Sequence, residues 1–370
     1  MSKPHAVLDC EVYRNYFLTK VRRIDTGAVR VFEQYEGHPL DVVALRATLS
    51  RITSVTFNGR NYDMPILGLA LTGATCEAIK RCSDFIIAGN MRPWDCERQF
   101  NFRTPDFDHI DLIEVAPGMV SLKVYAGRLH VQRMQDLPIE HDALIEPEQR
   151  SIILDYNDND LTATEALYWK FKKQLDLRVQ MSREYGVDLR SKSDAQIAEA
   201  VIRKRLTDQG VEVRKAEVRA RAFKFRFPNF LRNAGPIVQG LIDLVREADF
   251  VVDPGGYVKM PEQLAKAKIK IGNSVYRMGI GGLHSSEKSQ AVVADDEHVV
   301  IDRDVASYYP SIILKTKLFP RHLGESFLQI YQKLYDERIA AKRRAAELKK
   351  RIAEIERTLR EAGEEIPPAR

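Results

Sequence analysis

The chain has 370 residues, of which 44% are hydrophobic and 29% charged, and its formal net charge at pH 7 is +5. This length allows two or three domains with ordinary cores, and the composition is that of a soluble globular protein. No apolar run approaches the ~18 residues that a membrane span needs, so we expect no membrane protein. The mild positive charge alone selects no partner.

The N-terminal residues and the cysteines indicate a compartment. A strand-like run begins at His5, which leaves no room for a signal peptide, and we therefore expect none. No cysteine belongs to a CxxC pair or stands near a histidine at zinc-ligand spacing; the four are Cys10, Cys76, Cys82 and Cys96. We expect reduced thiols in a cytoplasmic protein.

The first third of the chain predicts a layered α/β domain. Extended runs at 5–13, 16–24 and 29–35 predict a meander of strands, with the DTG sequence at 25–27 as a turn. Further on, the patterns predict helices over 41–52, 64–73 and 121–130 and strands over 54–59 and 109–115. Pro65 is predicted to open the second of these helices, and Gly73 to close it. Strands that feed helices in this order favour an α/β architecture.

The remainder predicts longer helices and one further strand. Helical patterns cover 160–185 and 191–206, and residues 210–260 are mixed and rich in Arg and Lys. We place a domain boundary near residue 270, before glycines 279, 281 and 282, which indicate a hinge or a tight connector. The last predicted strand spans 299–313. A charged helix with apolar residues every three or four positions spans 326–362.

Two carboxylates interrupt the first predicted strand, in the sequence VLDCEVY. Asp9 and Glu11 stand two residues apart, and strand alternation sends both to the same face of the sheet. Like charges side by side repel each other, so the placement is costly unless a cation or a solvated edge receives them. A solvated edge is the ordinary explanation of a single DxE sequence.

Two further carboxylates give the first pair a possible purpose. Asp63 ends an apolar run at a strand-to-helix turn, and Asp160 is predicted to open a helix one turn after Tyr156. Four carboxylates from three segments can hold two divalent cations, and such hard oxygen ligands suit Mg²⁺ or Mn²⁺. Two ions about 4 Å apart stabilise the attacking and leaving oxygens of phosphodiester hydrolysis. The Tyr156 hydroxyl would orient the attacking water.

Three short segments resemble the exonuclease motifs of family B DNA polymerases. LDCE, TFNGRNYD and YNDND match the forms DxE, Nx₂₋₃(F/Y)D and Yx₃D. The resemblance implies an RNase H-like fold and a 3′→5′ proofreading exonuclease for single-stranded 3′ ends, with two Mg²⁺ or Mn²⁺ ions. The implied ligands are Asp9, Glu11, Asp63 and Asp160.

The same resemblance assigns roles to four other residues. Tyr156 would orient the attacking water, and Asn58 and Phe57 would touch the primer end. The segment 121–139 is similar to the segment that lies between the second and third motifs of the family, where Lys123 would assist the exonuclease. An exposed helix lysine explains Lys123 equally well.

A fourth segment, DRDVASYYPSII at 302–313, resembles polymerase motif A of the same family, DxxSLYPSI. The resemblance implies that Asp304 at a strand end holds the two metal ions of a polymerase site. Ser307, Tyr308 and Tyr309 would bind the incoming nucleotide, with the Tyr309 ring excluding a 2′-hydroxyl. Tyr308 stands where leucine is commoner in the family.

Two other polymerase motifs do not occur in these 370 residues, namely motif B (Kx₃NSxYG) and motif C (DTD). Polymerisation would therefore need a second polypeptide carrying them, or sequence outside these residues. The helix at 326–362 resembles the start of the polymerase fingers. Its cations would attract a nucleotide triphosphate, or they form an ordinary solvated face.

The resemblance predicts four regions. They are an RNase H-like exonuclease domain at 1–185, a helical or mixed linking region at 186–270, the start of the polymerase palm at 271–325 and a truncated helical fingers segment at 326–370. Primer–template DNA and dNTPs are the expected partners, in the cytoplasm of a bacterial or phage-infected cell. Two alternatives remain: a free-standing DEDD-type 3′→5′ exonuclease, and a non-catalytic module that binds DNA or docks a partner chain.

Overall fold

The structure of the protein is a computed structural model that describes residues 3–118, 120–214, 221–227, 231 and 235–363. The chain forms two compact units, Met1–Gln209 and Gly210–Arg370. The end of the predicted fingers segment, residues 364–370, lies outside the described residues.

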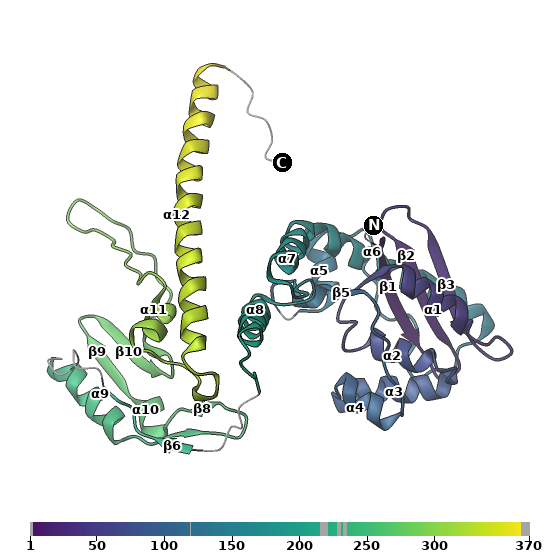
Figure 1. The fold of residues 1–370 in the computed structure, drawn as a ribbon, viewed down its shortest axis with the longest axis horizontal. Coiled ribbons are helices and arrows are strands. Elements are labelled where there is room, and N and C mark those ends of the chain that lie inside the picture. Colours follow the sequence, from purple (N-terminus) through teal and green to yellow (C-terminus); the bar gives the residue numbers. More distant parts are fainter. Residues whose placement is uncertain (1–2, 119, 215–220, 228–230, 232–234, 364–370) are drawn as a thin grey trace. The chain divides into compact units, whose positions relative to one another are not determined.

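The first unit is built on a five-stranded mixed sheet in the order β3-β2-β1-β4-β5 (Figure 1). The strands are β1 (His5–Val12), β2 (Phe17–Arg23), β3 (Val29–Gln34), β4 (Thr53–Thr56) and β5 (His109–Asp111). The first three form an antiparallel meander, whereas β4 runs parallel to β1 and β5 parallel to β4. The prediction of an α/β architecture is confirmed, and so is the turn at 25–27 between β2 and β3.

Eight helices and two short 3₁₀ turns are described in this unit. They are α1 (Val42–Arg51), α2 (Asp63–Ala70), α3 (Cys76–Gly89), α4 (Pro93–Gln99), η1 (Leu112–Glu114), α5 (Leu122–Arg128), η2 (Pro147–Gln149), α6 (Arg150–Lys170), α7 (Lys172–Tyr185) and α8 (Asp194–Asp208). Helix α8 begins with a capping box, in which Ser193 Oγ accepts from the Gln196 backbone N–H and the Gln196 side chain accepts from the Ser193 N–H.

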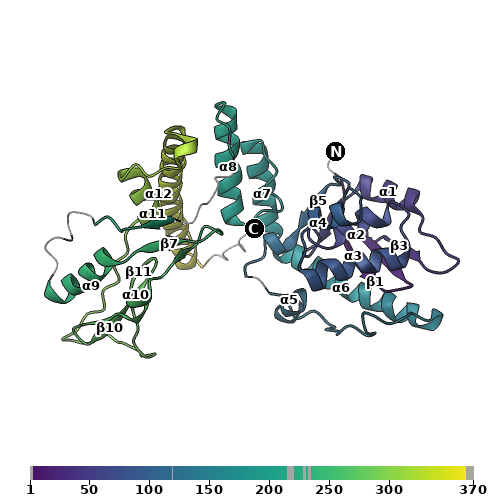
Figure 2. The ribbon, with the colours of Figure 1, turned by 90° about the horizontal axis from the view of Figure 1, so that it is seen from below.

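Strand β1 is buried on both faces, and its alternation decides which residues meet which helices. Its even-numbered residues, such as Leu8, pack in one core with residues of α1, α2 and α3. Val7 packs on the opposite face with Leu161 and Leu167 of α6. Figure 2 shows α1 on one side of the sheet and α6 on the other. Burying each of these aliphatic side chains contributes roughly 1.5–3 kcal/mol, so a register slip would be costly.

Helix α6 differs from the prediction at both ends. It begins at Arg150, ten residues before the predicted start at Asp160, because η2 runs directly into it. Glu146 and Gln149 form a reciprocal capping box at that turn, and Pro147 occupies its first position. The single helix predicted over 160–185 is wrong as well, since Phe171 lies outside helical geometry and separates α6 from α7.

The second unit holds two small three-stranded sheets. The first, in the order β6-β7-β8, contains β6 (Arg221–Phe223), β7 (Phe250–Val252) and β8 (Val258–Lys259). The second, in the order β11-β10-β9, contains β9 (Lys268–Ile271), β10 (Ser274–Gly279) and β11 (Gly282–Ser285). The helical elements are α9 (Pro236–Glu247), α10 (Glu262–Lys266), α11 (Tyr308–Lys315), η4 (Arg321–Leu323) and α12 (Ser326–Glu361).

The glycine-rich sequence at 279–282 forms a tight connector inside the second unit. Gly279 pairs with Gly282 at the end of β10 and β11, so only Ile280 and Gly281 form the hairpin loop. Gly282 has φ of +148°, a conformation that favours glycine. Neither loop residue has a positive φ, so the conformation that favours glycine occurs at Gly282, directly after the loop.

The strand predicted over 299–313 is wrong. The backbone from 286 to 305 belongs to no helix or strand, and Tyr308 onward is helix α11. Val299 and Val300 are 78% and 61% exposed. A strand is stable only where a neighbour supplies ladder hydrogen bonds and a covered face, and the described residues offer this segment neither.

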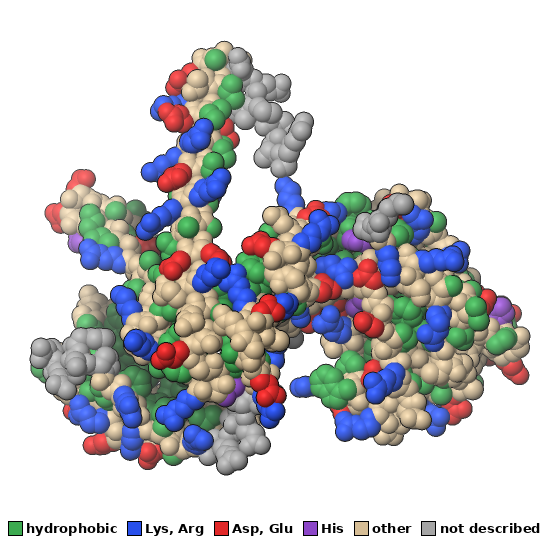
Figure 3. Space-filling view, viewed as in Figure 1, with side chains coloured by type: hydrophobic (Ala, Val, Ile, Leu, Met, Phe, Trp, Pro, Cys, Tyr) green, Lys and Arg blue, Asp and Glu red, His purple; other side chains and the backbone are tan. Residues whose placement is uncertain are grey.

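The long charged helix predicted over 326–362 is confirmed as α12. It is amphipathic in sequence, but Ile330 is its one buried residue among those described. Lys, Arg, Asp and Glu side chains are spread along its length (Figure 3). Among the described helices, none is both long and apolar enough to span a lipid bilayer.

Candidate metal centre

Three of the four predicted carboxylates converge in the first unit. One ligand oxygen each from Asp9, Glu11 and Asp160 can be chosen so that all lie within 4.8 Å of one another. Two of these residues come from β1 and the third from α6, which packs against that face of the sheet. Strand alternation therefore directs the Asp9 and Glu11 side chains toward α6, which carries the Asp160 carboxylate. Three oxygen ligands at this spacing can hold a divalent cation.

Asn157 joins the two carboxylates of β1. Its Nδ2 donates to Asp9 Oδ2 at 2.8 Å and to Glu11 Oε1 at 3.2 Å. The side chain is fully buried, and its Oδ1 has no hydrogen-bond partner among the described residues. Sequence reasoning missed this residue, although it stands between Tyr156 and Asp160 on the same helix and its position on the site-facing side could have been found from helical spacing.

The electrostatics of the centre oppose charged carboxylates. Burial raises the pKa of Asp9 well above its usual value, with Asp63 and Glu11 adding repulsion. Burial also raises the pKa of Glu11 to about 8, although the Asn157 amide works against the shift. The pKa of Asp160 is raised by burial too. A divalent cation in reach of these oxygens would reverse the preference for the protonated form.

Tyr156 lies where the third motif places it. Its side chain is 8% exposed and faces Asp160, one helical turn further along α6. Burial, followed by repulsion from the Asp160 carboxylate, raises the pKa of its hydroxyl. The hydroxyl therefore stays protonated at neutral pH and can donate a hydrogen bond at the edge of the centre.

Asp63 lies beside the triad but does not belong to it. Its side chain is 3% exposed at the start of α2, and Oδ1 accepts from the Cys10 backbone N–H at 3.1 Å. Burial, with Asp111 as the next cause, raises its pKa to about 7. The side chain therefore fastens α2 to β1 and adds repulsion to Asp9.

The loop between β4 and α2 is held by Asp111, a residue that sequence reasoning did not select. Its two carboxylate oxygens accept from the backbone N–H groups of Asn58 (2.8 Å) and Arg60 (2.9 Å). Asn58 has φ of +64°. Gly59 is required next to it, because an added Cβ would lie 2.1 Å from Thr56 Oγ1. An aspartate inside the strand predicted over 109–115 was the available signal.

The predicted DNA-contact residues Phe57, Asn58 and Lys123 are all half-buried. Phe57 is half-buried, and its ring stacks edge-on against Tyr125 with centroids 5.9 Å apart. The Asn58 side chain is half-buried and accepts from Asn61 Nδ2 at 2.9 Å. The ammonium group of Lys123 on α5 pairs with Asp136 at 2.9 Å. Its charge also lowers the pKa of Asp160, against the effect of burial.

The predicted polymerase residues lie in the second unit and form no comparable centre. Asp304 is exposed, and the rings of Tyr308 and Tyr309 are 51% and 68% exposed. Ser307 accepts from Arg338 of α12 at 2.7 Å. Within the described part of the chain, no group of three acidic, histidine or cysteine side chains surrounds Asp304 at metal-ligand spacing.

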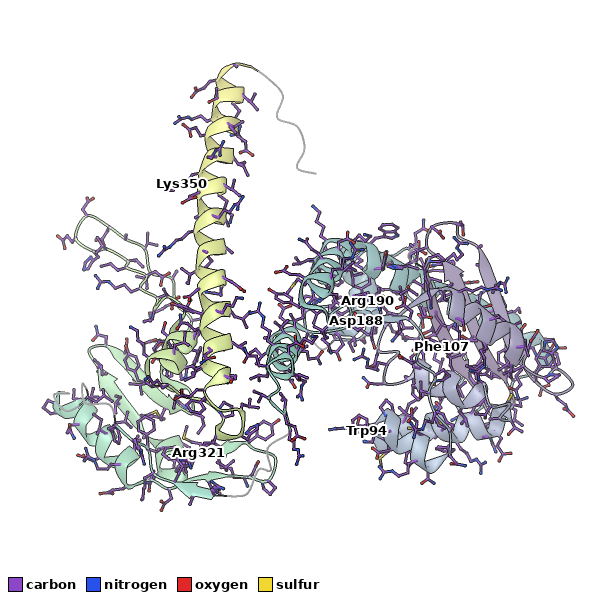
Figure 4. The ribbon with its side chains drawn as sticks, viewed as in Figure 1. Trp94, Phe107, Asp188, Arg190, Arg321 and Lys350 are labelled. Atoms are coloured by element: carbon purple, nitrogen blue, oxygen red, sulfur yellow. The ribbon has the colours of Figure 1, made fainter. Side chains whose placement is uncertain are left out.

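A separate cavity of about 710 Å³ lies in the first unit, away from the triad. Trp94 of α4, Phe107 before β5, and Asp188 and Arg190 after α7 line it (Figure 4). Arg190 is already paired with Asp188 (2.9 Å) and Asp108 (2.7 Å). The walls of the cavity carry four carboxylates and three cationic side chains, so the cavity does not favour a polyanion.

Comparison with known proteins adds no constraint. No protein-family profile, curated protein or solved structure shows significant similarity to this chain. The functional argument therefore depends on the residues of the centre and on the motifs described above.

Proposed function

We propose that the first unit is a metal-dependent 3′→5′ exonuclease that acts on single-stranded DNA ends. The observation that carries the proposal is the convergence of Asp9, Glu11 and Asp160 from a strand and a helix that are far apart in the sequence. The strand order β3-β2-β1-β4-β5, with an antiparallel meander followed by parallel strands, supports an RNase H-like fold. The three motifs of this fold family stand in the expected order.

The donor set fits Mg²⁺ or Mn²⁺. All three triad groups offer oxygen, which these hard cations prefer over nitrogen or sulfur ligands. The buried Oδ1 of Asn157, which lacks a partner among the described residues, is one more oxygen at the centre. Asp9, Glu11 and Asp160 would hold the cations, and Asp63, whose charge acts on Asp9, would be the fourth carboxylate of the set. Bound cations would supply charge stabilisation for the attacking and leaving oxygens of the phosphodiester.

The chain's own residues would prepare the substrate. The Tyr156 hydroxyl is protonated and would orient the attacking water by hydrogen bonding. The loop at 57–61, fixed by Asp111, would receive the 3′ end through Asn58 and the half-buried Phe57. Lys123 would balance the charge near Asp160. Hydrolysis would release one nucleotide at a time from the strand end.

We further propose that the second unit is the beginning of a polymerase of family B, incomplete without motifs B and C. Asp304 would then hold the metal ions of the polymerase site, and Ser307, Tyr308 and Tyr309 would bind dNTP. Two observations favour an exonuclease that works alone: the carboxylate centre lies wholly in the first unit, and the motif A segment forms no strand. A free-standing exonuclease is therefore the second candidate function.

The test is a nuclease assay on the purified chain. A 5′-labelled primer–template and a labelled single strand are incubated with Mg²⁺, with and without the four dNTPs, beside an Asp9→Ala variant. We expect a ladder that shortens from the 3′ end, that Asp9→Ala abolishes, and no extension in dNTPs. Extension would show that the second unit is competent by itself. Absence of cleavage and of divalent-cation binding would favour the non-catalytic module.

A further inference from the structure

We propose that Asn157 is a positioning residue that holds Asp9 and Glu11 in their metal-binding arrangement. The inference depends on the proposed metal centre and goes beyond it, since none of the motifs discussed above assigns a role to this position. It concerns the order of the ligands before a cation arrives, and it can fail while the exonuclease proposal stands.

The Asn157 amide is a donor that both carboxylates of β1 share. One amide group, Asn157 Nδ2, has two N–H bonds and directs them to Asp9 Oδ2 and Glu11 Oε1 at 2.8 and 3.2 Å. Each contact restricts the rotation of a carboxyl group that its neighbour would repel when both are charged. The pair is thereby fixed relative to α6, which also supplies Asp160 three residues later.

Lys20 is an alternative donor on the same face of the sheet. Lys20 of β2 is paired with Asp9 in the sheet register, and its side chain is almost fully buried. Its ammonium group, however, contacts Asp158 at 2.5 Å and the Leu154 carbonyl at 3.3 Å. The buried cation fastens β2 to α6, and the neutral amide of Asn157 is left to orient the two carboxylates. A neutral donor leaves their charge available to a divalent cation.

The Oδ1 atom of Asn157 is the remaining polar atom of the amide. Asn157 is 0% exposed, and its Oδ1 has no hydrogen-bond partner among the described residues. Buried polar atoms are rarely left unpaired unless a ligand or an ordered water uses them. An oxygen at this position can accept from a water bound to a cation or contact the cation itself. The amide would thus contact the carboxylates on one side and the metal's surroundings on the other.

The experiment measures Mn²⁺ binding by calorimetry on the full chain and its two Asn157 variants, Asn157→Ala and Asn157→Asp. Thermal unfolding in EDTA and in Mn²⁺ accompanies each titration. Asp155→Ala is the matched control, since Asp155 is an exposed residue of the same helix. Removing a group that orients metal ligands typically weakens affinity 10- to 100-fold. We expect a loss of that size for Asn157→Ala, a smaller metal-induced rise in unfolding temperature, and no change for the control.

The aspartate variant separates positioning from simple packing. Asn157→Asp adds a carboxylate to a buried acidic cluster, so we expect it to unfold at a lower temperature than the natural chain in EDTA. Addition of Mn²⁺ should then raise its unfolding temperature by more than it raises that of the natural chain. A residue that only packs would lose stability equally in both conditions. This variant also decides the question if Asn157→Ala does not fold.

The outcomes distinguish the two proposals. If the natural chain binds Mn²⁺ and Asn157→Ala binds it within about twofold of the same affinity, with Asn157→Asp showing no extra metal response, the role of Asn157 is refuted and the metal centre stands. If the natural chain binds no Mn²⁺ and cleaves no DNA, both proposals are refuted together.

Discussion

The two units of this protein contain motifs of similar apparent quality, yet their carboxylates end in different surroundings. Asp9 and Glu11 lie on a strand buried on both faces, and α6 brings Asp160 to them. Asp304 lies on an exposed segment without a neighbouring strand, and among the described residues it belongs to no group of three possible metal ligands. A motif becomes a site only when packing assembles its partners. The following predictions test that difference.

The largest expected effect comes from removing one triad carboxylate. Asp9→Asn should lower nuclease activity by about 10³-fold, because metal ligation supplies several kcal/mol of transition-state stabilisation and each 1.36 kcal/mol is a factor of ten. The same change should raise stability in EDTA, since folding no longer has to bury a carboxyl group whose pKa it raises well above the usual value. Asp304→Asn should leave nuclease activity unchanged. Equal losses for the two variants would remove the distinction between the units.

A pH effect is expected at the edge of the first unit's sheet. Burial is the main cause that lowers the pKa of His109 to about 4. The charges of Arg60 and Arg190 lower this pKa further, whereas the charge of Asp108 raises it. The unfolded chain takes up this proton near pH 6.5 and the folded chain only near pH 4. Stability should therefore fall by up to about 3 kcal/mol as the pH is lowered through that window.

The control for this pH effect is His109→Gln, which can still bond Thr56, the present partner of His109 Nε2 at 2.8 Å. Urea unfolding at pH 7 and at pH 4.5 should give a smaller stability difference for this variant than for the natural chain. Other titrating groups cancel in the comparison. An identical pH slope in the two proteins would contradict the assignment.

A moderate effect is expected at the tyrosine of the third motif. Tyr156→Phe removes the hydroxyl that faces Asp160 while keeping the buried ring, so folding should be retained. Misplacement of a reacting water costs up to about 10²-fold. We expect kcat to fall roughly 10- to 100-fold with little change in Mn²⁺ affinity. Tyr309→Phe in the second unit is the matched control and should leave nuclease activity unaltered.

The smallest effect compares one glycine from each unit. Gly59→Ala forces a Cβ against Thr56, and overpacking of this kind costs about 1–3 kcal/mol. Gly281 has no atom within 4 Å of the corresponding position, so Gly281→Ala should change stability by less than about 0.5 kcal/mol. Urea unfolding followed by circular dichroism measures both. A neutral Gly59→Ala would mean that the 57–61 loop tolerates rearrangement.

The sequence by itself determined the local geometry of the candidate centre. Alternation places Asp9 and Glu11 on one face of β1, and helical spacing places Tyr156 and Asp160 on one side of α6. Most elements of the first unit were predictable for the same reason, since hydrophobic periods and caps depend on neighbours within a few residues. Errors such as the start of α6 occurred where a preceding turn, not the hydrophobic period, sets the boundary.

Only the tertiary structure decided which of these faces meet. It brought Asn157 to the strand pair, directed Asp63 to the Cys10 backbone, and selected Asp111 as the anchor of the 57–61 loop. It also left residues 299–305 without a strand, despite their apolar character. Those outcomes depend on partners distant in the sequence, and the burial energy that selects such partners is a property of the whole packed unit.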